Sequence, residues 1–194
     1  MITRLPDASS FADVQSAVRS FRWRPEVEVV EISSPLRLAP FSMALEAEVR
    51  EMFGREYDTE GRLVVLHNPA GDDIWQGTTR FVSYLHADVE VEMATDPVLA
   101  DVAWSWLMDA LRNAGAEWVA ASGTVTAMTS HSFGELEATP QQAVIEVRSS
   151  WTAGTSGQDA RHIAAWQDLL CQVAGLEPQS DGVTKLVARA RRSS

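Results

Sequence analysis

Cysteine is almost absent from this chain, which has a single one, Cys171, among 194 residues. One cysteine cannot form an internal disulfide or supply a cysteine-rich zinc site. Lysine is equally scarce, because fifteen of the sixteen basic residues are arginine and only Lys185 is lysine. We interpret this bias as a coding preference. The alternative is a selective use of guanidinium groups to bind carboxylates or phosphates.

Long apolar runs and positive charge are also in short supply. No run reaches the length of a membrane-spanning helix, and the opening residues MITRLPDASSF contain no apolar signal core. The formal net charge is −11, so a nucleic acid or an anionic membrane surface would be repelled by most of the protein. We therefore expect a cytoplasmic protein without a membrane partner.

Motifs that identify a reaction are missing as well. The chain contains no GxSxG, P-loop, GxGxxG, HExxH, EF-hand or CxxC pattern. Phosphate-cradling loops and the standard nucleophile elbow therefore have no support, and no cofactor or metal is predicted. The composition, with 45% hydrophobic and 22% charged residues, is typical of a soluble globular protein with a real core.

The most informative feature present is a strict alternation in the segment RFVSYLHADVEVEM, residues 80–93. Apolar and small side chains share one parity, and Arg80, Tyr84, His86 and Asp88 share the other. A period of two is typical of a strand with one buried and one solvated face. The segment predicts a long central strand.

Other segments complete an α+β pattern. We predict strands at residues 27–32, 42–52, 62–67, 80–93, 118–131 and 143–151, although the alanine and glutamate content of 42–52 also favours a helix. We predict helices at residues 10–21 and 96–114, and a last helix built on Ile163, Trp166, Leu170 and Val173. This order predicts a mainly antiparallel sheet of about five to six strands with three helices packed on one face. Residues 1–180 are expected to form one domain.

Histidine offers the sharpest chemical hypothesis. His86 and Asp88 lie two residues apart on one strand, so their side chains share a face, and His67 ends a strand that could pair with it. The three could converge as metal ligands, or His86 and Asp88 could form a general-base pair. The simpler interpretation is a solvated polar face.

Two further places combine residues suited to binding. The loop from His67 to Arg80 contains Asp72, Asp73 and Trp75, which either contact a ligand or partner or serve a hairpin turn. Trp104 and Met108 lie at the edge of the inward stripe of a helix, where they extend the core or form an apolar patch for a partner. Trp106 and Trp166 lie on predicted core stripes. Cys171 is expected to be a buried, inert thiol.

The end of the chain, residues 181–194, is basic. Its charges are Lys185, Arg189, Arg191 and Arg192. We expect a tail that is disordered at its end or folds back onto the acidic domain. Contact with nucleic acid through this tail is a weaker alternative.

Three segments, LVVLHNPAGDDIWQGTTRFVSYLHAD, AASGTVTAMTSHSFGEL and AWQDLLCQVAGLEP, resemble an actinobacterial family known as domain of unknown function 3000. The resemblance implies an intracellular actinobacterial protein and agrees with the arginine bias, but it implies no catalytic residue. The order of elements is also similar to that of small acidic secretion chaperones, with one additional early strand.

These observations favour a non-enzymatic binding or adaptor protein, with a chaperone-like role as one form, acting on a protein partner or as a homodimer. Binding would use Trp104 and Met108 or the loop around Trp75. The alternative is a small-molecule-binding protein or enzyme with a pocket between sheet and helices. Its polar groups would be His67, His86, Asp88 and Asp72.

Overall fold

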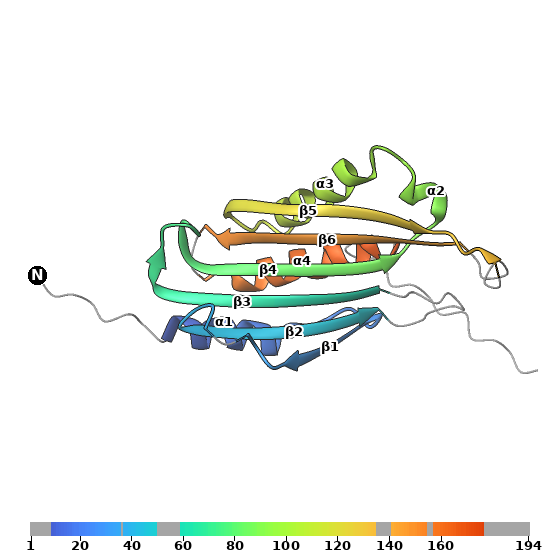
Figure 1. Cartoon of the computed structure of the whole chain (residues 1–194). Coiled ribbons are helices and arrows are strands. Elements are labelled where there is room, and N and C mark those ends of the chain that lie inside the picture. The colour runs from blue at the N-terminus through green and yellow to red at the C-terminus, as the bar shows by residue number, and fades with distance from the viewer. Residues whose placement is uncertain (1–8, 36, 50–58, 135–140, 155–156, 177–194) are drawn as a thin grey trace, which may run out of the picture.

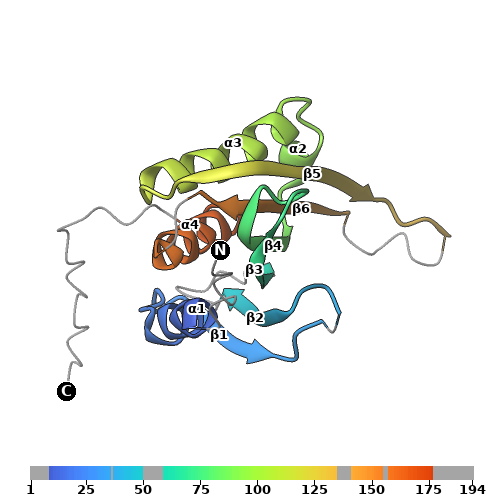
Figure 2. The same cartoon turned by 90° about the vertical axis from the view of Figure 1, so that its left-hand side faces the viewer.

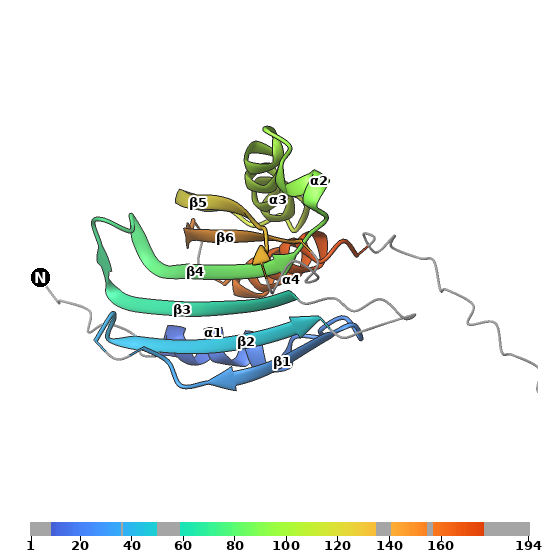
Figure 3. The same ribbon diagram turned by 45° about the vertical axis from the view of Figure 1, so that its right-hand side comes forward.

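Six strands build one antiparallel sheet, which Figure 1 shows from the face opposite its described helices. The computed structural model describes residues 9–35, 37–49, 59–134, 141–154 and 157–176. The strands are β1 Val27–Ile32, β2 Phe41–Val49, β3 Thr59–Asp72, β4 Gly77–Asp88, β5 Trp118–Ser130 and β6 Gln142–Ala153. Their order in the sheet is β1-β2-β3-β4-β6-β5, and every neighbouring pair is antiparallel. Figure 3 shows β1 to β4 following one another, with β6 and β5 beyond β4.

Helices cover one face of this sheet. The four helices of the described residues are α1 Ser9–Ser20, α2 Val91–Ala94, α3 Leu99–Asn113 and α4 Asp159–Val173. Helix α4 contacts α1, α3, β3 and β4, and α3 also contacts β5. Figure 2 shows α1 and α4 side by side on the same side of the strands. The predicted α+β class, antiparallel sheet and helix-covered face are confirmed.

The core lies between α4 and the odd-numbered side chains of the central strands. Phe81 and Leu85 of β4 and Val147 and Trp151 of β6 are fully buried, and so is Trp166 of α4. The Trp166 indole Nε1 donates a hydrogen bond to Ser83 Oγ over 3.0 Å. The odd-numbered, mostly apolar side chains of β4 therefore face the helices, as the alternation predicted, because only that face of the sheet excludes water.

One histidine is buried in the same core. His162 of α4 is fully buried, and its ring stacks on Phe81 with 4.8 Å between ring centroids. Its Nδ1 accepts a hydrogen bond from Trp151 Nε1 over 3.1 Å, which places the ring proton on Nε2. Within the described part of the chain, Nε2 has no hydrogen-bond partner. Burial lowers the pKa of His162 to about 4.

The predicted end of the long strand is wrong. Strand β4 stops at Asp88, and the next residues form the short helix α2, although the alternation continues to Met93. Strand β3 pairs with β4 only up to Ala87, and β6 only up to Asp88. No strand of the described residues pairs with residues 91–93, and their backbone forms its hydrogen bonds locally in a helical turn.

Other boundaries shift by a few residues. Strand β3 extends to Asp72, through the NPAGDD segment predicted as a loop, with an irregular register after His67. Helix α3 begins at Leu99 rather than at Asp96, whose carboxylate instead accepts a hydrogen bond from the Val98 N–H in the preceding turn. Strand β5 has an irregular register between Val119 and Ser122.

Some predicted segments lie outside the described residues. They are the basic tail with Lys185, Arg189, Arg191 and Arg192, most of the turn at residues 54–61, and most of the connection at residues 134–141. Among the described residues, no helix is long and apolar enough to cross a membrane.

Candidate functional site

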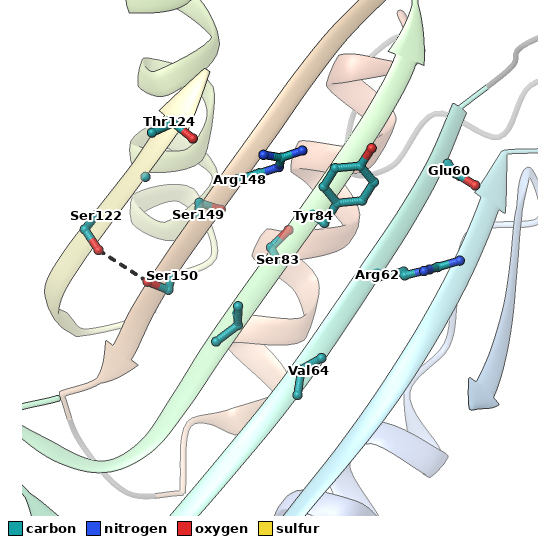
Figure 4. Close-up of a pocket in the computed structure, with 12 residues that line it drawn as sticks. Glu60, Arg62, Val64, Ser83, Tyr84, Ser122, Thr124, Arg148, Ser149 and Ser150 are labelled. Atoms are coloured by element: carbon teal, nitrogen blue, oxygen red, sulfur yellow. Dashed lines mark hydrogen bonds between the residues drawn. The ribbon is translucent and has the colours of Figure 1, made fainter. Parts of the chain in front are cut away.

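Even-numbered side chains of β3, β4 and β6 project from the face that carries no described helix. The strand register arranges them in rows across the sheet. One row consists of Arg62, Tyr84, Arg148 and Thr124, and its neighbour of Val64, Val82, Ser150 and Ser122. Because the sheet is antiparallel throughout, each row brings together side chains from four strands. Figure 4 shows labelled members of both rows on one face.

These rows line an open groove of about 860 Å³. Val64 and Val82 form an apolar stretch, with polar and charged side chains on both sides. The remaining lining residues are Glu60, Arg62, Ser83, Tyr84, Ser122, Gly123, Thr124, Arg148, Ser149 and Ser150. The sequence predicted a pocket between sheet and helices, and most of that space is filled by the core. One smaller hollow lies there, and of the four predicted polar groups its lining includes only Asp88. The groove lies on the opposite face.

Arg80 lies one row beyond the apolar stretch and connects three strands. Its Nη1 donates to the Ala120 carbonyl and to Thr152 Oγ1, each over 2.9 Å. Its Nη2 donates to Ser150 Oγ over 2.7 Å and to Ser122 Oγ over 3.4 Å. Ala120 has a φ of +50° within the bulge of β5, where its carbonyl reaches Arg80 instead of the β6 ladder.

The charge of Arg80 is not balanced locally. No carboxylate of the described residues lies within ion-pair distance of its guanidinium group. Asp72 acts on Arg80 from beyond ion-pair distance and raises its pKa, while the larger effect of burial lowers it. Arginine stays protonated at any ordinary pH. Arg80 therefore carries a positive charge, without a direct ion-pair partner among the described residues, next to this end of the groove.

Arg80 does not itself line the groove, and the two arginines that do are paired with acids. Arg148 forms a 2.7 Å ion pair with Glu146 and lies over the Tyr84 ring, 5.5 Å from its centroid. Arg62 forms a 2.8 Å ion pair with Glu46 of β2. These arginines are largely exposed, so the pairs contribute little to stability. Their charges are balanced, unlike that of Arg80.

The structure does not bring His67, His86 and Asp88 together. His67 is buried on the helix-covered face, where its Nδ1 lies 2.9 Å from Thr79 Oγ1, and burial lowers its pKa. His86 lies on the open face, with its Nδ1 3.8 Å from Glu146 Oε1. The two histidines occupy opposite parities of neighbouring strands, which sends them to opposite faces. Among the described residues, no group of three potential ligands could hold a metal ion.

The loop with Asp72, Asp73 and Trp75 forms the β3–β4 hairpin turn. The Asp72 carboxylate accepts hydrogen bonds from the backbone N–H groups of Ile74 and Trp75, over 2.9 and 3.1 Å. Gln76 closes the turn with a φ of +61°. Asp73 is exposed and Trp75 is half-buried. This geometry agrees with the interpretation of the segment as a hairpin turn, because the Asp72 carboxylate already accepts hydrogen bonds from the backbone of the turn.

Trp104 and Met108 are half-buried against the core on α3. The Trp104 ring lies over Gly123 of β5, where a Cβ atom would be only 2.7 Å from ring atom Cζ3. Part of Trp104 is therefore used in the contact between α3 and the sheet.

Trp106, predicted on the core stripe, is only half-buried. It lines a second hollow of about 530 Å³ together with Asp88, Glu90 and Met93.

Gly123→Ala tests this contact. We expect the substitution to lower the free energy of unfolding by about 2 kcal/mol, because overpacking a tight contact forces a backbone shift. The new Cβ would lie 2.4 Å from the Arg148 carbonyl oxygen as well as 2.7 Å from Trp104. Urea unfolding measures the effect, with Thr126→Ala, at an exposed position of β5, as the control. An unchanged midpoint for Gly123→Ala would contradict the described packing.

Cys171 is buried, as predicted, with 3% of its surface exposed. Burial raises the pKa of its thiol to about 11, although Arg24 acts in the opposite direction. A thiol with so high a pKa is almost entirely protonated near neutral pH, and the thiolate is the reactive form. Cys171 therefore belongs to the core rather than to a reactive site.

Comparison with known proteins gives a family but no described activity. No curated protein and no solved structure matches the chain. One family profile, described as a protein of unknown function, DUF3000, matches residues 7–184. That match spans most of the 194 residues. The chain thus belongs to the DUF3000 family of proteins of unknown function.

Proposed function

We propose that this chain is a non-enzymatic binding protein that holds a small organic molecule in the groove on its open sheet face. The observation that carries the proposal is the groove itself, whose volume of about 860 Å³ suits an organic ligand. Val64 and Val82 offer apolar contact, and the polar rows on either side offer orientation. This proposal retains the small-molecule binding that the sequence suggested, but its site is on the other face of the sheet.

The chemistry of the groove supports binding rather than catalysis. A serine nucleophile needs a neighbouring base that can take its proton. The hydroxyl of Ser150 instead accepts a hydrogen bond from Arg80, which cannot act as a base because it stays protonated. Ser122 Oγ lies 3.3 Å from Ser150 Oγ, and neither hydroxyl has a described histidine or carboxylate partner.

A cytoplasmic location is part of the proposal, supported by the single buried cysteine and the lack of any disulfide. An adaptor role, in which a protein partner is bound through Trp104 and Met108 or through Trp75, is the competing hypothesis. It requires these half-buried side chains to release some of their internal contacts.

Val82→Trp tests the groove as the binding site. Val82 is 37% exposed in the middle of the apolar stretch, so an indole there would fill the groove. Val30→Trp is the matched control, because Val30 is 49% exposed on the edge strand β1 and does not line the groove. Each protein is purified gently from its native host and weighed by native mass spectrometry.

We expect a reproducible small added mass on the wild type and on Val30→Trp, and a loss of about tenfold or more in occupancy on Val82→Trp. That loss corresponds to about 1.4 kcal/mol of binding free energy. An added mass the size of a protein, or a small added mass that Val82→Trp retains, would contradict the proposal.

A further inference from the structure

We propose that the groove binds an organic anion, whose carboxylate or phosphate group is held by the Ser122 and Ser150 hydroxyls beside Arg80. This inference rests on the proposed function and names the chemical class of its ligand. Three features of the described residues support it: a positive charge without a direct ion-pair partner, hydroxyl protons directed by that charge, and an apolar stretch next to them.

The first feature is the charge. Arg80 is half-buried at the end of the groove and has no ion-pair partner among the described carboxylates. Arg62 and Arg148, in contrast, are both neutralised by glutamates. A positive charge in a partly desolvated site attracts an anion more strongly than one surrounded by water. An anion would restore the balance at this end of the groove.

The second feature is the direction of the hydroxyl protons. Ser150 Oγ accepts from Arg80 over 2.7 Å, so its own proton must point away from the guanidinium group. Ser122 Oγ lies 3.3 Å from Ser150 Oγ, and only one of the two can donate to the other. At least one proton of the pair is therefore free to donate toward the groove that both residues line. A hydroxyl that accepts from a cation is also a stronger donor.

The third feature is what surrounds the two serines. The register places Val82 beside Ser150, and Val64 beside Val82, so the apolar stretch begins next to the hydroxyls. Glu60, in the row beyond Arg62, carries negative charge at the opposite end of the groove. An anion with an apolar body would therefore bind with its charged group toward Arg80 and away from Glu60.

Four naphthalene probes of the same size test this assignment: naphthoate, naphthyl phosphate, the neutral naphthamide and the cationic naphthylmethylammonium. Their dissociation constants are measured by NMR titration at low ionic strength, where charge effects are least screened. The variants are Arg80→Gln, the double variant Ser122→Ala/Ser150→Ala, and Val82→Trp. Arg112→Gln is the charge-matched control, because Arg112 is exposed on α3 and pairs with Asp109.

We expect naphthoate or naphthyl phosphate to bind best, and the better of the two identifies the anionic group. Arg80→Gln should weaken that binding about tenfold or more, and so should the double serine variant, as for hydrogen bonds to a charged group. Naphthamide affinity should stay within about twofold in both variants, which shows that the groove itself is intact. Arg112→Gln should change nothing.

Three outcomes would overturn the inference, and the first two leave the proposed function standing. If naphthamide or the ammonium probe binds at least as tightly as the anions, and Val82→Trp abolishes that binding, the anion assignment is wrong while the binding groove stands. The same holds if anion affinity is insensitive to Arg80→Gln and to the serine variant. If no probe binds in a way that Val82→Trp abolishes, the proposed function fails together with the inference.

Discussion

Replacing Trp166 by alanine is expected to lower the free energy of unfolding by about 3–5 kcal/mol, as for other fully buried aromatic residues. Trp166 has no exposed surface, and its indole lies where α4 meets β3 and β4. A Cβ atom on Gly61 would lie 3.1 Å from its Cζ2 atom, so the ring packs directly over the β3 backbone. The substitution would also leave Ser83 Oγ without its indole donor.

Urea unfolding followed by circular dichroism measures this effect. Trp166→Phe should retain most of the apolar contact and lower the free energy of unfolding by a smaller amount, about 1–3 kcal/mol, mainly through the lost hydrogen bond and a smaller cavity. Trp75→Ala, at a half-buried position in the β3–β4 turn, is the control and should change stability by less than about 1 kcal/mol. Equal effects of Trp166→Ala and Trp75→Ala would contradict the described core.

Acidification is the second condition expected to have a large effect, and His162 is its main cause. Burial lowers the pKa of His162 from 6.5 to about 4. The unfolded chain therefore binds a proton more readily than the folded protein between these two values. Stability is then fully present above about pH 6.5 and falls as the pH drops toward about 4. One pKa unit corresponds to about 1.4 kcal/mol, so the full loss is about 3 kcal/mol.

The structure gives this loss a local cause. Protonation of His162 would place a proton on Nδ1, the atom that accepts the hydrogen bond from Trp151 Nε1. Two donors would then face each other in a fully buried place. His67 contributes with the same sign, because burial lowers its pKa as well. Burial raises the pKa values of Asp159 and Asp168 above their usual 3.8. Protonation of these two carboxyls therefore increases stability as the pH falls, which is the opposite of the histidine effect, and it does so at a lower pH.

Unfolding free energies measured between about pH 7.5 and 5.5 test this expectation in the window where the histidines dominate. His162→Asn keeps an acceptor near the position of Nδ1 but cannot be protonated, so it should flatten the pH dependence and leave only the part due to His67. His131→Asn is the control, because His131 is exposed and bonded to Gln141. A slope that His162→Asn leaves unchanged would exclude His162 as its source.

Local pattern was sufficient to predict most of the fold. The alternation of β4 and β6 placed Phe81, Leu85, Val147 and Trp151 on the buried face, where the structure has them. Gly115 follows α3 with a φ of +63°, a backbone conformation that glycine adopts most readily after a helix. Such features depend on neighbours within a few residues, which the sequence displays directly.

The groove could not be predicted in the same way, because it depends on which strands are neighbours. Arg80 and Ser150 are seventy residues apart, and they meet only because β6 pairs with β4 while β5 lies at the edge. Alternation gives the face of each side chain but not its cross-strand partner. The register was also what the hypothesis of a His67–His86 site lacked. It aligns His67 with Thr79 and His86 with Glu60, so the two histidines lie in different rows and on opposite faces.

The order of the strands also has a consequence for how the protein assembles. Strands β1 to β4 form a meander of sequence neighbours, and β5 and β6 form a separate hairpin, so the β4–β6 pair is the seam between two locally formed halves. Closing that seam joins Arg80 to Thr152 across a long stretch of chain, so we expect it to be slower than the formation of either half. The groove spans the seam, with Tyr84 on one side and Arg148 on the other. A ligand held there would bridge the two halves and slow their separation, so that the unfolding rate would report whether the groove is occupied.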